Sequence, residues 1–256
     1  MFRKKIFLQS LFINILVGLF FRGGYNYYMI KNKSAAENSI DDVELGDHIC
    51  SIYQNKKQQF SLLVPFFKAG LENNQKCVYI IDENSEEEIL SEFLKRGIDL
   101  DKYIKSKQFE LLTKKETYLK DGYFDPDKMI RLIKDTEENA LKHGYLSMRL
   151  TGEMTWVLAD ESDIDQLKIY ESKLTDFFLH SKSAAICQYN ESKFTEDVLL
   201  MVLNTHPFAI IYGDLFENDY YSSVQRIKKA AELPFDLSMY ENLKNSIINN
   251  KNNKKV

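Results

Sequence analysis

The sequence contains few cysteines, and their spacing argues against a disulfide framework. Only three occur in 256 residues, Cys50, Cys77 and Cys187, and no two of them form a CxxC pair. An odd number of widely separated thiols is typical of a protein that stays in a reducing compartment. We therefore expect a cytoplasmic protein whose thiols are buried and structural.

Glycine is also scarce, with ten residues, and none lies where a phosphate-binding loop would need it. A nucleotide-binding α/β protein places a glycine-rich loop ending in Lys-Ser/Thr after its first strand. Here that segment, Tyr53–Phe60, reads YQNKKQQF. The motifs GxGxxG, GxSxG and HExxH are absent as well. The sequence therefore argues against ATP hydrolysis and the common hydrolase and metalloprotease classes, and we expect no cofactor.

The sequence also has no excess of positive charge. The formal net charge is -4 at pH 7, so no overall field attracts nucleic acid or anionic lipid. Direct binding to nucleic acid is not expected.

The apolar run at residues 6–21 is shorter than the roughly 20 residues that span a bilayer. Its basic start and apolar centre fit a signal-anchor, although no small-residue cleavage site follows. Another interpretation is that translation starts at Met29, because the residues at 22–24, Arg-Gly-Gly, can be encoded by a ribosome-binding sequence. A membrane anchor and a mis-assigned start both stay open. In either case residues 1–40 are predicted to be an extension that precedes the folded body.

Strand and helix patterns alternate through residues 41–233. Apolar runs predict strands, and apolar residues at three- and four-residue spacing predict helices. The strands are expected at Asp47–Tyr53, Cys77–Asp82, Phe109–Thr113, from Ser147, at Ala184–Tyr189 and at Phe208–Tyr212; the helices are expected at Lys56–Leu71, Ser85–Gly97, Asp125–Gly144, Ser162–His180, Thr195–Leu203 and Tyr221–Leu233. This order predicts one α/β domain with a doubly wound, mostly parallel sheet. Residues 234–256 are expected to form a polar tail that frays from Asn245.

The stretch Ser147–Trp156, SMRLTGEMTW, places an arginine inside an apparent buried strand. A buried guanidinium needs a partner, since an unpaired one costs several kcal/mol, roughly. Glu153 follows at the strand end, where open α/β sheets bind their ligands, and Glu171 is a second candidate partner. Arg149, Glu153 and Trp156 are therefore predicted to form a wall of a ligand pocket. The alternative, an Arg–Glu pair that only ties the strand to a helix, stays open.

His48 and Cys50 are two residues apart on a predicted strand, so their side chains point to the same face. With Cys187 or His206 they could in principle bind a soft metal. These residues are distant in sequence and form no motif, so buried structural thiols are the default and no metal site is predicted. His206-Pro207 is more typical of a turn than of a catalytic base.

Several stretches together resemble the MEDS family, the methanogen/methylotroph, DcmR sensory domain. They cover most of the chain in the family's order: GDHICSIY at 46–53, VPFFKAGLENNQKCVYI at 64–80, RLTGEMTW at 149–156, Tyr170-Glu171, ICQYN at 186–190, His206-Pro207, Asn218 and Tyr220-Tyr221. The resemblance implies a sensory domain for small hydrocarbon derivatives. It also implies a RecA/KaiC-like three-layer sandwich without the nucleotide-binding loop (Walker A). Relatives are joined to DNA-binding domains or histidine kinases, but no output domain is evident here.

We therefore expect a non-enzymatic sensor that binds a small organic ligand at the carboxyl ends of the sheet. A histidine kinase or a transcription regulator would be its partner. Two alternatives stay open: an enzyme with Glu153 as general base, assisted by His48 or His206, and an interaction module derived from a degenerate ATPase-like fold. In this sensor His48, Cys50 and Tyr53 are expected to form one wall of the pocket, and Arg149, Glu153 and Trp156 the other. The full set of predicted ligand-binding residues is His48, Cys50, Tyr53, Arg149, Glu153, Trp156, Glu171, Tyr189 and His206.

Overall fold

A computed structural model describes residues 40, 43–159, 161–218, 220–221 and 238–253, without the side chains of 161–163, 238–239 and 250–253. All of them belong to one compact unit, Ala35–Val256. The predicted helix Tyr221–Leu233, apart from Tyr221 itself, and the apolar run at 6–21 lie outside the described residues.

A seven-stranded sheet forms the middle layer. Its order is β3-β2-β4-β5-β1-β6-β7. The first six of these strands pair in parallel, and β7 pairs antiparallel with β6. The strands are β1 (His48–Tyr53), β2 (Lys76–Ile81), β3 (Phe109–Thr113), β4 (Met148–Glu153), β5 (Ser183–Asn190), β6 (Phe208–Ile211) and β7 (Asp214–Glu217). The predicted α/β architecture with a mostly parallel sheet is confirmed.

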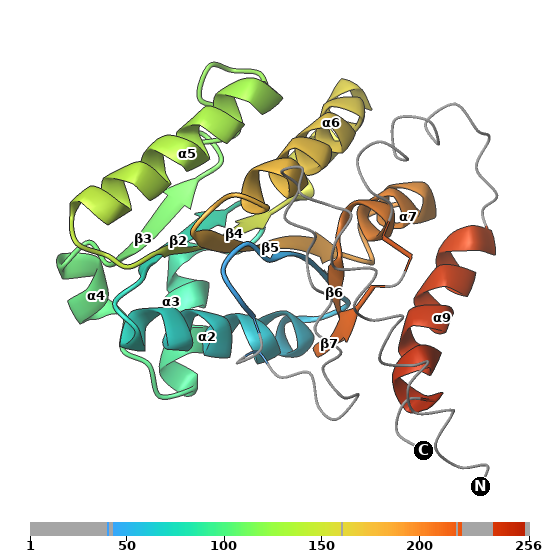
Figure 1. Ribbon diagram of the computed structural model, residues 1–256, viewed down its shortest axis with the longest axis horizontal. Helices are drawn as coiled ribbons and strands as arrows, with labels where there is room; N and C mark the ends of the chain where they lie inside the picture. The colour runs from blue at the N-terminus through green and yellow to red at the C-terminus, as the bar shows by residue number, and fades with distance from the viewer. Residues whose placement is uncertain (1–39, 41–42, 160, 219, 222–237, 254–256) are drawn as a thin grey trace, which may run out of the picture. The chain divides into compact units, whose positions relative to one another are not determined.

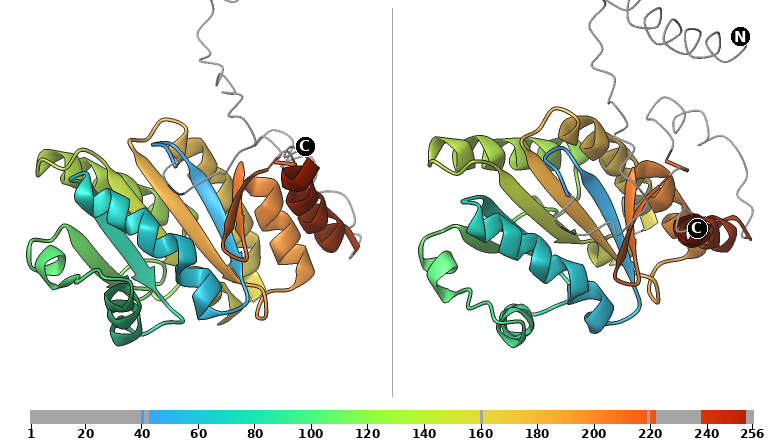
Figure 2. Two further views of the ribbon diagram at one scale, coloured as in Figure 1. Left: turned by 90° about the horizontal axis from the view of Figure 1, so that it is seen from below. Right: turned by 60° about the horizontal axis from the view of Figure 1, so that its bottom comes forward.

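Helices cover both faces of the sheet (Figures 1 and 2). One face carries α2 (Lys56–Glu72), α3 (Glu86–Lys95) and α4 (Asp101–Lys105). The other carries α5 (Pro126–Lys142), α6 (Glu161–Phe178) and α7 (Glu196–Thr205), with α9 (Ser238–Asn253) beside α7. The short 3-10 helix η2 (Thr155–Ala159) joins β4 to α6. The result is a three-layer sandwich.

Local signals set the helix boundaries. Ser85 caps α3 through a capping box with Glu88, and Asp125 caps α5 ahead of a proline in its first turn. Gly97 and Gly144 follow α3 and α5 with φ of 81° and 89°. A residue without a Cβ adopts that left-handed conformation at little cost, so the helices end where glycine allows the chain to turn.

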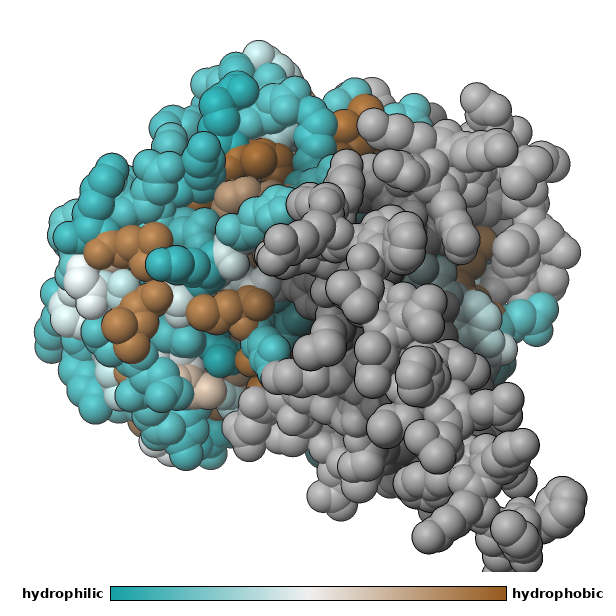
Figure 3. All heavy atoms as spheres, viewed as in Figure 1, coloured by the Kyte–Doolittle hydropathy of each residue, from teal (hydrophilic) through white to brown (hydrophobic). Residues whose placement is uncertain are grey.

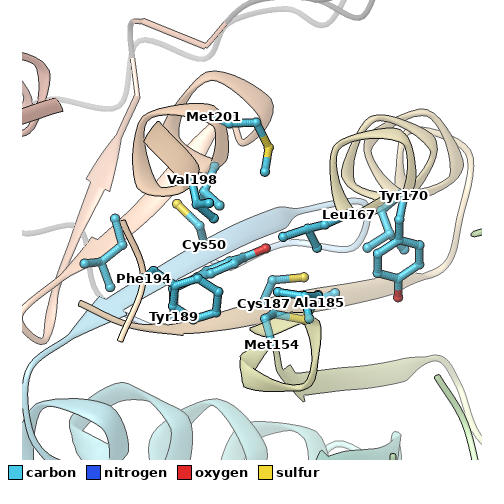
Figure 4. Packing of buried hydrophobic residues seen from close by; sticks show 14 of the residues in the cluster. Cys50, Met154, Leu167, Tyr170, Ala185, Cys187, Tyr189, Phe194, Val198 and Met201 are labelled. Carbon is cyan, nitrogen blue, oxygen red and sulfur yellow. The ribbon is translucent and has the colours of Figure 1, made fainter. Parts of the chain in front are cut away.

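The alternation of side chains along each strand divides the core in two. Ile49 of β1 packs under α2 with Phe60 and Phe67, whereas Cys50 packs under α6 and α7 with apolar residues such as Leu167. Figure 4 shows Cys50, Cys187 and Tyr189 in the second core, between strands β1 and β5 and the helices α6 and α7. His48 and Cys50 are two residues apart on β1, so both side chains point to the same face of the sheet, the one that α6 and α7 cover.

Three elements differ from expectation. Helix α4 and strand β7 were not predicted; β7 follows β6 through a two-residue turn at Tyr212-Gly213, both with positive φ. Helix α9 occupies most of the tail that was expected to fray. Its Asn-rich sequence is a poor helix former, but Tyr240 and Ile247 are buried against the core. Tertiary packing stabilises this helix in spite of its propensity.

Among the helices that the structure describes, none combines the length and apolar character needed to cross a bilayer. On the face in Figure 3, apolar side chains of described residues form separate patches among hydrophilic ones. Scattered apolar residues of this kind are normal on a protein surface and do not mark a binding site.

Candidate functional site

The pocket wall predicted from β4 is not assembled as one wall. Arg149 and Glu153 point to the α2 face, but they lie at opposite ends of β4, about 13 Å apart at the usual rise of a strand. Trp156 lies on the other face of the sheet, in the core under α5 and α6. Tyr53, predicted to share a wall with His48 and Cys50, contacts α2 through Gln59 instead. Neither predicted wall is assembled. Tyr53 is separated from His48 and Cys50 by odd numbers of residues on β1 and faces the opposite way, whereas Arg149 and Glu153 are kept apart by the length of β4.

Arg149 ties β4 to helix α2. Its Nε donates to Gln75 Oε1 at 2.6 Å, and its Nη1 donates to the Phe66 carbonyl at 3.1 Å. The guanidinium lies 4.7 Å from the centre of the Phe66 ring. Gly70 leaves room for the side chain, since a Cβ at that position would lie 2.8 Å from Arg149 Cδ. These contacts support the structural role that the sequence left open, although the predicted partner Glu153 does not take part.

Glu153 is fully enclosed and accepts hydrogen bonds from five donors. Its Oε2 accepts from the backbone amides of Asp82, Glu83 and Asn84 at 2.8, 2.5 and 2.9 Å. Its Oε1 accepts from the Tyr79 hydroxyl at 2.8 Å and the Asn84 side-chain amide at 2.6 Å. The carboxylate therefore holds the turn between β2 and α3. Its lone pairs are taken up by these donors, so the geometry does not favour a general base.

On the opposite face of the sheet, four chemically reactive side chains converge from distant parts of the sequence. They are His48 at the start of β1, Glu171 on α6, Cys187 in β5 and His206 at the end of α7, and all are buried. One ligand-type atom from each residue lies within 4.8 Å of all the others. Glu171 Oε2 is 3.3 Å from His48 Nε2 and 3.2 Å from His206 Nε2, and His48 Nε2 is 3.4 Å from Cys187 Sγ. We call this group the buried centre.

The hydrogen bonds of the two imidazoles fix which nitrogen faces the buried centre. His206 Nδ1 lies 2.8 Å from the Val202 carbonyl, which can only accept, so Nδ1 carries the proton. His48 Nδ1 lies 2.9 Å from the Thr175 hydroxyl, which itself donates to a backbone carbonyl. In each neutral ring, Nε2 is then an unprotonated nitrogen directed at Glu171.

The carboxylate of Glu171 is held from its other side. Tyr189 donates its hydroxyl proton to Oε1 at 2.5 Å. Oε2 has no hydrogen-bond partner, and neither has His206 Nε2, although both atoms are fully buried. A buried polar atom without a partner costs about 1–3 kcal/mol, so such atoms call for an explanation.

Burial and mutual charge set the protonation of the buried centre. Desolvation, reinforced by His206, lowers the pKa of His48 to about 4. Desolvation by itself would raise the pKa of Glu171, but the two neighbouring histidines outweigh it and hold that pKa below its usual value. Burial, with the charge of Glu171, raises the pKa of the Cys187 thiol well above its usual range. At neutral pH the buried centre thus contains an ionised carboxylate, a neutral His48 and a neutral thiol.

Next to the buried centre, on the same face, lies a cluster of four aromatic side chains. The Trp156 ring stacks on Tyr118 at 4.7 Å between centroids and contacts Phe124 at 4.3 Å. Tyr170, the neighbour of Glu171 on α6, packs edge-on against Tyr118 and Phe124. The indole Nε1 of Trp156 is buried and has no hydrogen-bond partner.

Phe124 also lines a surface hollow of about 580 Å³ between the start of α5 and helix α6. The hollow therefore adjoins the aromatic cluster. Its rim is polar: Asp127 and Lys173 form an ion pair across it at 2.5 Å.

Of the residues predicted from the sequence, the structure gathers His48, Cys50, Glu171, Tyr189 and His206 around one point and places Trp156 in the aromatic cluster nearby. Cys50 lies on the same face but outside the four-residue group; its thiol donates to the Phe208 carbonyl at 3.7 Å. Tyr53, Arg149 and Glu153 lie on the α2 face. From the sequence, Cys187 is a candidate only as a metal partner. Tyr118, Phe124 and Thr175 are not candidates, because no spacing signal links them to the motif residues.

Asn218, which also contributes to the family resemblance, is structural. Its side-chain amide donates to the carbonyls of Leu203 and His206 at 2.6 and 2.8 Å. It therefore holds the turn that carries His206.

The sheet, its two helical layers and the buried centre define a three-layer α/β protein with a group of polar side chains inside one of its cores. The chain belongs to the MEDS family, the MEthanogen/methylotroph, DcmR Sensory domain, whose family model matches residues 47–207.

Among solved structures, the chain is similar to a KaiC-like protein from the hyperthermophilic archaeon Pyrococcus horikoshii OT3, with 13% identity and a TM-score of 0.46. The match covers 65% of this chain and 70% of the other. No curated protein matches the chain.

Proposed function

We propose that this chain is the small-molecule sensor of a signalling or transcription-regulating system, and that it binds a small organic ligand without turning it over. Membership of a sensory-domain family supports the general role. The ligand site that we propose is the aromatic cluster of Tyr118, Phe124, Trp156 and Tyr170. The signal would pass to a separate protein of the histidine-kinase or transcription-regulator type.

The observation that carries the proposal is the unpaired indole N–H of Trp156. It is a buried donor without a partner, surrounded by aromatic rings. Small-molecule sites are mostly apolar with a few directed polar groups, and their volumes are about 300–1,000 Å³. The aromatic cluster would supply the apolar part of such a site, and the adjoining hollow of about 580 Å³ falls within that range of volumes.

The chemistry of the cluster indicates the class of ligand. Aromatic faces favour an apolar body, and the indole N–H needs an acceptor atom such as the oxygen of a carbonyl, ether or alcohol. A short hydrocarbon derivative with one such group satisfies both requirements. Phe124 contacts both the hollow and Trp156, so a ligand that enters through the hollow passes this ring.

Tryptophan fluorescence gives a direct test, because Trp156 is the only tryptophan in the chain. Short alcohols, aldehydes, ethers and chlorinated alkanes are titrated while emission and melting temperature are recorded. A bound compound changes the emission and raises the melting temperature by mass action. Trp156→Phe, which keeps an apolar ring but removes the N–H, weakens binding about tenfold in the melting assay.

Tyr103→Phe on helix α4, in the other helical layer, is the matched control and leaves binding unchanged. The proposal fails if no compound in the panel alters either signal, or if Trp156→Phe binds as well as the wild-type chain. Recovery of the bound compound unchanged after prolonged incubation is also expected. Conversion of the compound that tracks protein concentration would show an enzyme instead.

A further inference from the structure

We propose that His48, Glu171, Cys187 and His206 bind a divalent transition-metal ion, zinc in the first instance, in tetrahedral coordination. The proposal goes beyond the sensing function and depends only on the geometry of these four side chains. Their convergence is the one group of three or more potential metal ligands found in the described part of the chain.

The distances between the ligand atoms match a tetrahedral site. Zinc binds imidazole nitrogen and carboxylate oxygen at about 2.0–2.2 Å and thiolate sulfur at about 2.3 Å. In a tetrahedron with such bonds, neighbouring ligand atoms are about 3.3–3.6 Å apart. Three of the six separations in the buried centre are 3.2, 3.3 and 3.4 Å, and none of the six exceeds 4.8 Å. The ligand atoms are therefore close to the spacing of a metal site, and small side-chain movements bring the more distant pairs into range.

Hydrogen bonding explains why a cation belongs there. With a single proton on each ring, held at Nδ1, the Nε2 of each histidine is an acceptor. Each Nε2 faces Glu171 Oε2, which is also an acceptor, and Oε2 and His206 Nε2 have no donor. Acceptors that face one another in a dry interior repel unless a proton or a metal ion lies between them, and a proton bridges only two of them. A metal ion satisfies all of these lone pairs at once.

The groups that hydrogen-bond to the four proposed ligands orient them as metal sites require. Metal-binding histidines usually donate their other N–H to a carbonyl, hydroxyl or carboxylate, which fixes the ring. Here His206 donates to the Val202 carbonyl, and His48 donates to Thr175. Tyr189 holds the remaining oxygen of Glu171. Each of these contacts directs a lone pair at the same point.

Charge and ligand type indicate the class of metal. On binding, the Cys187 thiol releases its proton to solvent and binds as thiolate, so two anionic and two neutral ligands face a divalent cation. Imidazole and thiolate favour zinc and its neighbours over magnesium or calcium. Four protein ligands close the coordination sphere, which is the pattern of a structural site. The ion would join β1, β5, α6 and the turn after α7.

Metal analysis of the full chain, purified without chelators, tests the proposal. We expect elemental mass spectrometry to find about one zinc ion per chain. Replacement with Co²⁺ should give the intense visible bands of tetrahedral cobalt and a thiolate-to-cobalt charge-transfer band in the near ultraviolet. Cys187→Ser should lose the charge-transfer band, and His206→Gln should lose most of the bound metal.

Cys77→Ser is the matched control, since Cys77 is also a buried thiol but packs in the other core and is not one of the four ligands. It should retain both the metal and the spectrum. Wild-type protein that is folded yet takes up neither zinc nor cobalt contradicts the proposal. A cobalt spectrum of the wild-type protein without the charge-transfer band also contradicts the proposal. This measurement needs no variant, so it remains a valid test even if the substitutions prevent folding. Metal binding is measured without organic compounds, so its failure leaves the fluorescence test of the sensing function unaffected.

Discussion

Three consecutive backbone amides point at one oxygen of Glu153, and two side chains hold the other. An ionised acceptor in such a nest forms charge-assisted hydrogen bonds, which are stronger than neutral ones. The position of Glu153 at the carboxyl end of β4 predicts a ligand there. The structure shows that the protein's own β2–α3 turn occupies that place.

Glu153→Gln should therefore destabilise the fold. The substitution replaces one acceptor oxygen with an NH₂ donor among groups that already donate, leaving buried amides unpaired. We expect a loss of about 2–4 kcal/mol in the free energy of unfolding, measured by urea denaturation. Glu138→Gln removes an exposed carboxylate that pairs with Lys142, and should change the same free energy by less than about 1 kcal/mol. Equal effects of the two substitutions would contradict the structural role.

At the scale of elements, the docking of helix α9 on the sheet involves hydrogen bonds to one carboxylate, that of Glu191. Glu191, just after β5, accepts hydrogen bonds from Tyr240 and Lys244 of α9 and from Tyr212 after β6. Gln54 completes the set. Burial by itself would raise the pKa of Glu191, but the hydrogen bonds from Tyr240, Lys244 and Tyr212 outweigh it and hold the pKa below 4.5.

The docking of α9 should therefore depend on pH in the acid range. Because the folded-state pKa of Glu191 is lowered, its stabilising effect is present above pH 4.5 and is lost as the pH falls through the folded value. Hydrogen exchange of residues 238–253, corrected for intrinsic rates, should show α9 losing protection before the central strands. In the Glu191→Gln variant, α9 should no longer lose protection early as the pH falls. Its protection should instead be weaker than in the wild-type protein at every pH. Identical pH profiles for both proteins would disprove the dependence.

The sequence predicted all six parallel strands and most helices, because their apolar periodicity and capping residues are local signals. It missed β7, which is only four residues long, and α9, whose stability comes from contacts with distant residues such as Glu191. The candidate site shows the same limit. Strand parity placed His48 and Cys50 on one face, but it could not show that Glu171 and His206 arrive there from α6 and α7. It also did not show that Arg149 and Trp156 lie on opposite faces.

At the scale of the whole molecule, the proposed metal ion would link elements that are distant in sequence. Its ligands span residues 48 to 206, so unfolding of the domain destroys the site. Free zinc at about 1,000 times its dissociation constant adds about 4 kcal/mol to the stability of the native state. For a domain of this size we expect the melting temperature to rise by about 8–16 °C over the chelated protein.

Cys77→Ser should show the same zinc-dependent rise, and His206→Gln should show little of it. A melting temperature that is equal with zinc and with chelator would argue against a metal ion that joins the sheet to α6 and α7.

The most direct measurement is X-ray absorption at the zinc edge of the wild-type protein. It reports the atoms around the metal without any substitution. The structure predicts one sulfur at about 2.3 Å and three nitrogen or oxygen atoms at about 2.0–2.1 Å, with the outer-shell scattering of two imidazoles. A shell of oxygen atoms alone, or one with two or more sulfurs, would contradict the assignment of His48, Glu171, Cys187 and His206.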